Sequence, residues 1–150
     1  LNGNEEVVIQ VKTNMGQAFK ALNKVASGGE LSRISLALSV VTSKSDLAPS
    51  IVFDEVDVGI SGAVAEVVGR LLRGLSSRYQ VLCVTHLAQV AVQGHAHMKV
   101  VKSEQDGETF TEVHALGDKE RTDEVARILG GIKITQKTRI AAAEMIKTVA

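Results

Sequence analysis

Two short apolar segments joined by one amphipathic segment constrain the fold of this chain more than any other feature. Residues 51–53 are apolar at every position, and residues 80–85 form a second, largely apolar run. Strands covered on both faces have this composition. Between the two runs, apolar side chains recur at the three- and four-residue spacing of a helix: Val64, Val67, Val68, Leu71, Leu72 and Leu75. We therefore predict a strand, a helix capped by Ser61 and a second strand, joined by a right-handed parallel crossover.

The residues before this unit predict another strand and another helix. Val7, Ile9 and Val11 occupy alternate positions, which is the period of a half-buried strand. A helix that ends before Pro49 is indicated by a second apolar stripe at helical spacing: Leu31, Ile34, Leu38 and Val41.

The residues after the unit predict a hairpin and two helices. Residues 98–102 and 109–116 flank a polar, glycine-containing turn at 105–108, as the strands of a hairpin do. Helices are expected over residues 121–129 and 136–149, the first ending at Gly130 and Gly131. The predicted fold class is therefore α/β, a mostly parallel sheet flanked by helices with a C-terminal β-hairpin and helices, in a single domain over residues 1–150.

Composition narrows the function classes. Of the 150 residues, 45% are apolar and 23% charged, which suits one globular domain. Seventeen basic and seventeen acidic residues cancel, and only 3% are aromatic, so neither a broad basic surface for nucleic acid nor base stacking is expected. No apolar run approaches the roughly 20 residues that cross a bilayer, and the start is not a secretion signal, so we expect a cytoplasmic protein without a membrane partner.

Two further details bear on the nature of the chain. The single cysteine, Cys83, lies inside an apolar run, which indicates a buried strand residue more than a reactive thiol. The first residue is Leu1 and not methionine, so we expect the chain to be a segment of a longer protein.

Candidate site residues follow the first predicted strand directly. Asp54 and Glu55 would lie at its carboxyl end, and His86 at the carboxyl end of the second strand. These ends share the edge where open α/β sheets bind ligands. There Asp54 is placed to hold Mg²⁺, Glu55 to orient or deprotonate a water molecule, and His86 to reach a terminal phosphate. The alternatives are a solvated acidic turn and a surface histidine at a helix start.

A third candidate segment opens the predicted helix that starts near residue 31. Ser27 and Glu30 have the spacing of a capping box, a structural role that accounts for this pair alone. Gly28 and Gly29 remove side chains where an anion could approach the backbone amides and the positive end of the helix. Because the chain contains no Gly-x-x-x-x-Gly-Lys-Ser/Thr loop, we expect the main grip on a nucleotide to lie on other polypeptide.

Together, residues 25–33, 51–62 and 84–91 resemble the carboxyl-terminal lobe of an ATP-binding-cassette ATPase of the chromosome-maintenance type. The resemblance covers nearly the whole chain and implies half of a P-loop NTPase domain. Glu30, where transporters usually carry glutamine, favours chromosome maintenance over membrane transport. Ala88 departs from the pattern, because the family usually has proline there.

The resemblance also implies a role for each candidate residue. Residues 27–30 would be the signature motif, which touches the γ-phosphate of ATP on the opposite head of a dimer. Asp54 would be the Walker B magnesium ligand and Glu55 the catalytic base. Asp57 would be the D-loop residue at a subunit contact, and His86 the switch histidine.

The same resemblance implies cofactors and partners. ATP and Mg²⁺ would be bound together with a Walker A lobe, which a coiled-coil arm separates from this one. Two heads would form a homodimer that opens and closes on DNA during double-strand break repair and recombination, in the cytoplasm at the nucleoid. The isolated segment would bind ATP poorly and hydrolyse almost none.

Alternatives remain open at this stage. The chain could belong to another chromosome-organising ATPase, or be a non-catalytic dimerisation module. A zinc site is conceivable on the hairpin, where His95 and His97 would share a strand face near His114. Arginines on or after the long helix are expected on its solvated face, with a local contact to an anion or DNA as the alternative: Arg70, Arg73 and Arg78.

Overall fold

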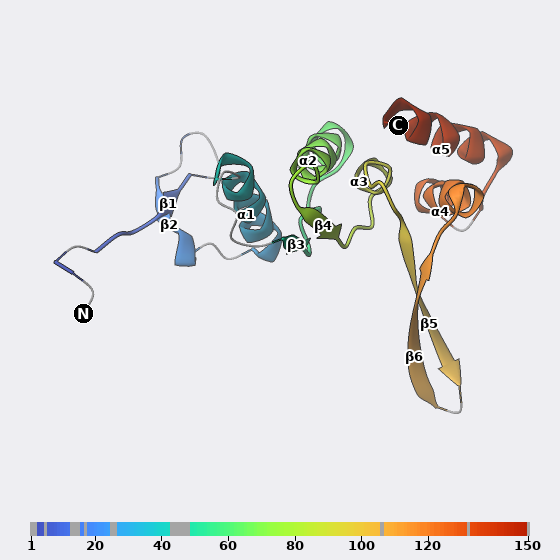
Figure 1. The fold of residues 1–150 in the computed structure, drawn as a ribbon, viewed down its shortest axis with the longest axis horizontal. Helices are drawn as coiled ribbons and strands as arrows, with labels where there is room; N and C mark the ends of the chain where they lie inside the picture. The colour runs from blue at the N-terminus through green and yellow to red at the C-terminus, as the bar shows by residue number, and fades with distance from the viewer. Residues whose placement is uncertain are drawn as a thin grey trace.

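The structure, a computed structural model, describes residues 3, 4, 6–12, 16, 18–24, 27–42, 49–105, 107–131 and 133–149. Its elements follow one another in nearly chain order along the longest axis, and the β5–β6 hairpin projects to one side (Figure 1). In order they are β1 (Gln10–Val11), β2 (Lys20–Ala21), the 3-10 helix η1 (Leu22–Lys24), α1 (Gly28–Thr42), β3 (Ser50–Phe53), α2 (Gly62–Leu75), β4 (Gln80–Cys83), α3 (Ala88–Ala91), β5 (Met98–Gln105), β6 (Glu108–Ala115), α4 (Asp118–Gly130) and α5 (Gln136–Val149).

The predicted strand, helix and strand unit is confirmed. β3 and β4 pair in parallel, in register from Ser50 opposite Gln80 to Phe53 opposite Cys83, and α2 connects them. One face of α2 packs on this pair and on α1, because its apolar residues recur with the helical period. The buried residues of this core are Leu36, Phe53, Val56, Ala65, Val68, Leu72, Leu75 and Val90. Ser61 is the N-cap residue of α2, but its side chain makes no capping hydrogen bond.

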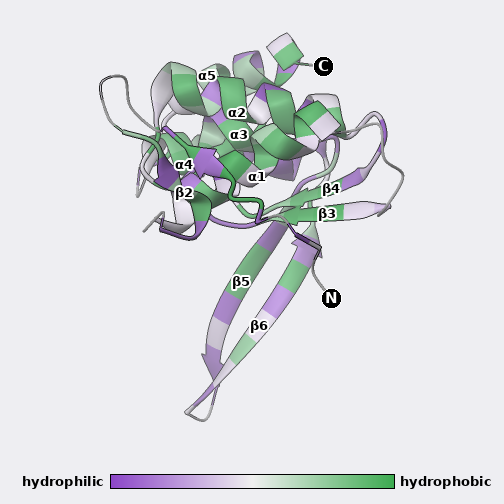
Figure 2. Cartoon of the chain, turned by 90° about the vertical axis from the view of Figure 1, so that its left-hand side faces the viewer, coloured by the Kyte–Doolittle hydropathy of each residue, from purple (hydrophilic) through white to green (hydrophobic). Residues whose placement is uncertain are grey.

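The prediction of a mostly parallel sheet is wrong for the part of the chain that the structure describes. The described strands form three two-stranded sheets, and only the β3–β4 pair is parallel. Helices α1 and α2 lie on one side of β3 and β4 (Figure 2), so the expected cover on both faces is missing as well. Val52 is 65% exposed and Leu82 44% exposed on the other face.

The apolar stripe predicted for α1 is not its buried face. Leu36 is 1% exposed and forms the contact with the core, and Val40 packs beside it. Leu38 and Val41 are exposed, and the helix begins at Gly28, before Leu31. The reason is that packing against α2 and β3, and not the spacing of apolar residues, selects which side of α1 faces inward.

The strand predicted over residues 7–12 is reduced to the two residues of β1, which pair with β2 in an antiparallel sheet. Val7 and Ile9 lie outside the strand and are exposed. A pair of two-residue strands offers too little surface to bury a face, so the alternating pattern has nothing to pack against among the described residues.

The carboxyl-terminal half follows its prediction closely. β5 and β6 pair antiparallel from Met98 opposite Ala115 to Gln105 opposite Glu108, although position 106 of the predicted turn lies outside the described residues. α4 begins three residues earlier than predicted, where a Glu120 side-chain oxygen accepts from the Gly117 amide at 2.9 Å. A second core joins α3, α4 and α5 through Ala88, Val92, Val125, Ala126 and Ala142. Among the described residues, no helix is both long and apolar enough to span a bilayer.

Candidate functional site

The turn after β3 carries the two predicted acidic residues at the surface. Asp54 and Glu55 are both exposed, and one Asp54 carboxylate oxygen accepts from the Glu55 amide at 2.9 Å. Glu55 has a φ of 57°, a left-handed conformation that is rare for a residue with a side chain and that recurs at functional sites. Val56 and Asp57 then turn inward and are buried. The turn therefore exposes two carboxylates at the end of β3, and the next two residues are buried.

The start of α1 lies against this turn. Leu31 donates its amide to the Ser27 carbonyl at 3.0 Å, and the Glu30 amide lies 3.5 Å from the Ser27 hydroxyl, a long capping contact. A Cβ atom on Gly28 would lie 2.5 Å from a Glu55 side-chain oxygen, and one on Gly29 3.0 Å from the Val58 carbonyl oxygen. The two glycines thus let the helix start approach the acidic turn within the same chain.

Two residues of α1 that the sequence analysis left without a role hold the turn in place. The Ser32 hydroxyl donates to the Asp54 carbonyl at 2.7 Å. Arg33 donates through Nη1 to the Val58 carbonyl at 2.7 Å and to the Val56 carbonyl at 3.4 Å. Their signal in the sequence is position: each lies four residues after one of the glycines, on the helix face that meets the turn.

Asp57 connects the turn to the end of β4. It is 2% exposed, and its Oδ2 accepts from the Thr85 hydroxyl at 2.5 Å and from the His86 amide at 3.0 Å. The same oxygen lies 3.3 Å from Nδ1 of the His86 ring, whose side chain is 67% exposed. The D-loop role expected for Asp57, at a subunit contact, stays a prediction. Thr85 is a further residue that the sequence analysis did not single out.

These contacts link the three predicted segments into one continuous arrangement. The start of α1 touches the turn at Glu55, and Asp57 of that turn touches His86. Asp54, Glu55 and His86 all remain exposed beside this network. Exposed carboxylate oxygens suit Mg²⁺, which keeps several water or phosphate ligands and uses one or two protein carboxylates. The arrangement therefore fits a Mg²⁺-bound phosphate.

The zinc alternative is wrong for the described residues, among which no three histidine, cysteine or acidic side chains gather as metal ligands would. β5 begins only at Met98, so His95 and His97 precede the strand and do not share its face. The third histidine, His114, lies 3.1 Å from a Glu112 carboxylate oxygen instead.

Cys83 lies next to the acidic turn, and the pKa of its thiol depends in part on the charge of that turn. The thiol is half-buried and has its pKa raised to about 11, first by burial, then by the negative charges of Asp57 and Asp54. A thiol with this pKa stays protonated at neutral pH, which agrees with the predicted role as a packed strand residue.

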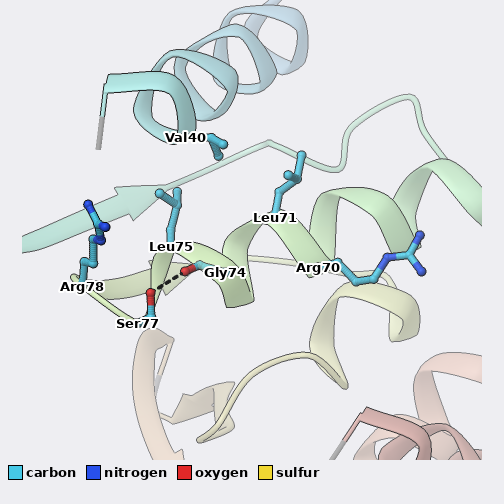
Figure 3. A pocket seen from close by; sticks show the side chains of 7 residues that line it. All are labelled: Val40, Arg70, Leu71, Gly74, Leu75, Ser77 and Arg78. Atoms are coloured by element: carbon cyan, nitrogen blue, oxygen red, sulfur yellow. Dashed lines mark hydrogen bonds between the residues drawn. The ribbon is translucent and has the colours of Figure 1, made fainter. Parts of the chain in front are cut away.

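A surface hollow of about 230 Å³ lies away from this site (Figure 3). Val40 of α1 faces Leu71 and Leu75 of α2 across it, and Arg70 and Arg78 stand at opposite ends. Arg70 pairs with Glu66 at 3.1 Å, one turn earlier on α2. The hollow contains none of the candidate residues.

Comparison with known proteins gives a consistent family. No family model matches the chain. DNA repair protein RecN of Haemophilus influenzae is 52% identical over 148 residues, which are 99% of this chain and 26% of that protein. RecN of Vibrio cholerae is 51% identical over 96% of this chain, and RecN of Bacillus subtilis 41% identical over 97%. The chain spans about a quarter of the length of these relatives.

A solved structure from work on the ATP-driven dimerization and DNA-stimulated activation of SMC ATPases shares the fold. It superposes with a TM-score of 0.57 at 22% identity, covering 89% of this chain and 80% of the other. The resemblance stated from the motifs is thereby confirmed: along nearly its whole length, this chain is related in sequence to the DNA repair protein RecN and has the fold of part of an SMC-type ATPase.

Proposed function

We propose that this segment is the carboxyl-terminal lobe of an ATPase head that acts in DNA double-strand break repair and recombination. The observation that carries the proposal is the exposure of Asp54, Glu55 and His86 around one connected network of contacts. The same three groups are the ones that phosphoryl transfer to water needs: a metal ligand, a group that orients water and a donor to phosphate.

Each side chain has a defined task in this proposal. Mg²⁺, when bound with ATP, neutralises the charge that develops on the phosphates. Asp54 would hold this ion, directly or through water, from the end of β3. Glu55 would orient the attacking water and accept its proton, since its carboxylate stands at the surface on a tightly turned backbone. His86 would contact the terminal phosphate.

The signature role of residues 27–30 is part of the same proposal. The helix start would offer backbone amides to the γ-phosphate of ATP on a second head. In the single chain this helix start faces the Glu55 side chain, which comes within 2.5 Å of where a Cβ on Gly28 would stand. Closure of two heads over ATP therefore requires Glu55 to turn from its own α1 towards the nucleotide.

A Walker A lobe is the partner that this segment needs first. The chain lacks the phosphate-binding loop, and the open face of β3 and β4 exposes Val52, Leu82 and Val84. A parallel pair with one bare apolar face is typical of a sheet that continues into, or is covered by, other polypeptide. The relatives are about four times as long, so they contain enough chain to supply that lobe and a coiled-coil arm.

Dimerisation and DNA complete the proposal. Two heads would close over two ATP molecules and reopen after hydrolysis, and the whole protein would use this cycle on DNA in the cytoplasm. The support is the name of the RecN relatives as DNA repair proteins and the ATP-driven dimerization described for the SMC ATPases.

The decisive experiment replaces Glu55 with glutamine in the full-length protein that carries this segment. Because the amide cannot accept a proton from water, we expect turnover of ATP to fall by at least about 100-fold while ATP still binds and dimers accumulate. Steady-state hydrolysis, equilibrium ATP binding and analytical ultracentrifugation measure the three quantities. Glu66→Gln, on the exposed side of α2, is the matched control and should leave all three unchanged.

Unchanged turnover in Glu55→Gln would remove Glu55 as the base, and loss of ATP binding would point to a structural role. The isolated segment provides a second test. Without a Walker A lobe it should bind ATP weakly and hydrolyse almost none, so full activity of the segment alone would contradict the division of the site between two lobes.

A further inference from the structure

The carboxylate of Asp57 is more deeply buried than any other acidic group at the site, and all its contacts run to two consecutive residues. Oδ2 receives the Thr85 hydroxyl, the His86 amide and the near approach of His86 Nδ1. We propose that Asp57 is a positioning residue, which holds the His86 ring with its proton on Nδ1 and leaves Nε2 as an acceptor on the exposed side. The consequence for turnover rests on the proposed function, whereas the state of the ring does not.

Because Asp57 is buried, its carboxylate requires these hydrogen-bond donors. At 2% exposure, a carboxylate is tolerated only where donors replace the water that it has lost. The Thr85 hydroxyl has one proton to donate. Its oxygen lies 2.5 Å from Oδ2 of Asp57 and 3.5 Å from the Leu87 carbonyl oxygen, so Asp57 is the nearer acceptor. The Thr85 oxygen in turn accepts from the Leu87 amide at 3.1 Å. The Leu87 amide therefore orients the Thr85 hydroxyl, which donates its proton to Oδ2 of Asp57 and so fixes the position of that oxygen.

The fixed oxygen then decides which ring nitrogen of His86 carries the proton. Nδ1 lies 3.3 Å from Oδ2, so a proton on Nδ1 is attracted by the carboxylate, whereas a lone pair there would be repelled. A neutral imidazole has one protonated nitrogen, so Nε2 keeps its lone pair. Nδ1 is the ring nitrogen beside the carboxylate and the side chain is 67% exposed, which leaves Nε2 to meet solvent or ligand.

This state of the ring defines what His86 offers to a nucleotide. A neutral His86 accepts a hydrogen bond from water through Nε2 and donates to a phosphate oxygen only after it gains a second proton. Asp57 is thus assigned a role inside one head, in addition to the subunit-contact role that the resemblance implies.

The test reads the ring directly in the full-length protein, with ¹⁵N in its histidine rings. Spectra are recorded at an alkaline pH at which imidazoles are neutral, and His86→Gln identifies the His86 signals. We expect the wild-type signals of a ring protonated on Nδ1. Asp57→Ala removes the acceptor beside Nδ1 and should shift the proton predominantly to Nε2. Glu66→Gln, which removes an exposed carboxylate on α2 and leaves every contact of Asp57 in place, is the matched control and should retain the wild-type pattern.

Kinetics supply the second readout. Asp57→Ala should lower kcat of ATP hydrolysis by about 10-fold, as removal of a residue that orients a functional imidazole does, with KM changed less than twofold. A wild-type ring protonated on Nε2 would overturn the proposal, as would an Asp57→Ala ring that keeps its proton on Nδ1. If Asp57→Ala fails to fold, the wild-type spectrum still decides. A protein with the expected ring states but no ATP turnover would refute the proposed function and leave this inference standing.

Discussion

Charged side chains do different work in the site-bearing segment, residues 27–87, and in the carboxyl-terminal segment, residues 97–149. In the first, the charged side chains around the acidic turn bond mainly to the backbone: Arg33 donates to two carbonyls of the turn, and Asp57 accepts from the His86 amide. In the second, they bond mainly to one another. Glu124, which is nearly buried, accepts from Arg127 at 2.6 and 3.0 Å and lies 2.7 Å from Lys99 Nζ on β5.

The difference shows which acidic groups remain free for a ligand. In the carboxyl-terminal segment, carboxylates join elements to each other, and the hydrogen bond from Arg127 lowers the pKa of Glu124 to about 2. Asp54 and Glu55, by contrast, form no ion pair within the described residues, because Ser32 and Arg33 hold their turn through its carbonyls. The structure therefore keeps the acidic turn rigid without neutralising its side chains.

The largest effect on this comparison is expected from a substitution at the contact between α1 and the acidic turn. A Cβ on Gly29 would lie 3.0 Å from the Val58 carbonyl oxygen and 3.2 Å from that of Glu55, neither of which can move without the backbone. We expect Gly29→Ala to cost about 2 kcal/mol of local stability. Hydrogen exchange of the α1 and 55–58 amides in the full-length protein measures this.

Gly28→Ala is the matched control for this prediction. Its new methyl group meets only the end of the Glu55 side chain, which can rotate away. Exchange of the same amides should stay close to wild type in Gly28→Ala, and equal costs in the two variants would show that the close approach between α1 and the turn does not constrain the site.

The second prediction tests the ion pairs that hold the carboxyl-terminal segment. Glu124→Gln should lower the stability of α4 and its junction with β5 by about 1.5 kcal/mol at pH 7, because the contacts with Arg127 and Lys99 lose the negative charge that strengthens them. The folded pKa of about 2 lies below the ordinary 4.5, so the wild-type advantage is present above pH 4.5 and is lost as the pH falls towards 2. Exchange rates of the α4 amides in both proteins, compared at high and low pH, check the sign.

Glu112→Gln provides the control for that measurement. Its carboxylate also contacts a nitrogen-bearing side chain, the imidazole of His114, but both side chains are exposed on the hairpin. An exposed pair contributes less than about 0.5 kcal/mol, so this variant should differ little from wild type. A cost equal to that of Glu124→Gln would mean that burial does not distinguish the two carboxylate contacts.

Sequence reasoning succeeded where a local pattern determines the outcome. The apolar period of residues 64–75 predicted α2, and the polar turn near Gly107 predicted the hairpin, because both depend on neighbours in the sequence. The positions of Asp54, Glu55 and His86 were accessible for the same reason: Asp54 directly follows β3, and Glu55 and His86 lie shortly after the ends of β3 and β4. Their roles came from the resemblance to a family and remain proposals.

Sequence reasoning failed where partners distant in the sequence decide. The inward side of α1 is selected by packing on α2 and β3, so Leu36 was missed although it is the most buried residue of that helix. From the all-apolar run we expected both faces of β3 to be covered. Such a run does not show whether the described residues or other polypeptide cover the second face. The contacts of Arg33 and Thr85 escaped because each crosses more than twenty residues to a loop.

The smallest expected effect uses Cys83 as a gauge of the charge at the acidic turn. Burial is the main cause of its raised pKa, and Asp57 and Asp54 follow in that order. Removal of either negative charge lowers the pKa from about 11, so more thiolate is present at pH 8 and alkylation accelerates. We expect Asp54→Asn, at an exposed position that leaves the fold intact, to increase the rate about two- to threefold.

Asp57→Asn should increase the Cys83 rate more than Asp54→Asn does, because its charge acts more strongly on the thiol. Mass spectrometry of the peptide that contains Cys83, after timed exposure to iodoacetamide, gives the rates in the full-length protein. Glu66→Gln removes a carboxylate that does not act on Cys83 and should leave the rate unchanged. If all three variants react alike, burial alone protects the thiol, and the acidic turn does not carry the unneutralised charge that distinguishes it from the carboxyl-terminal segment.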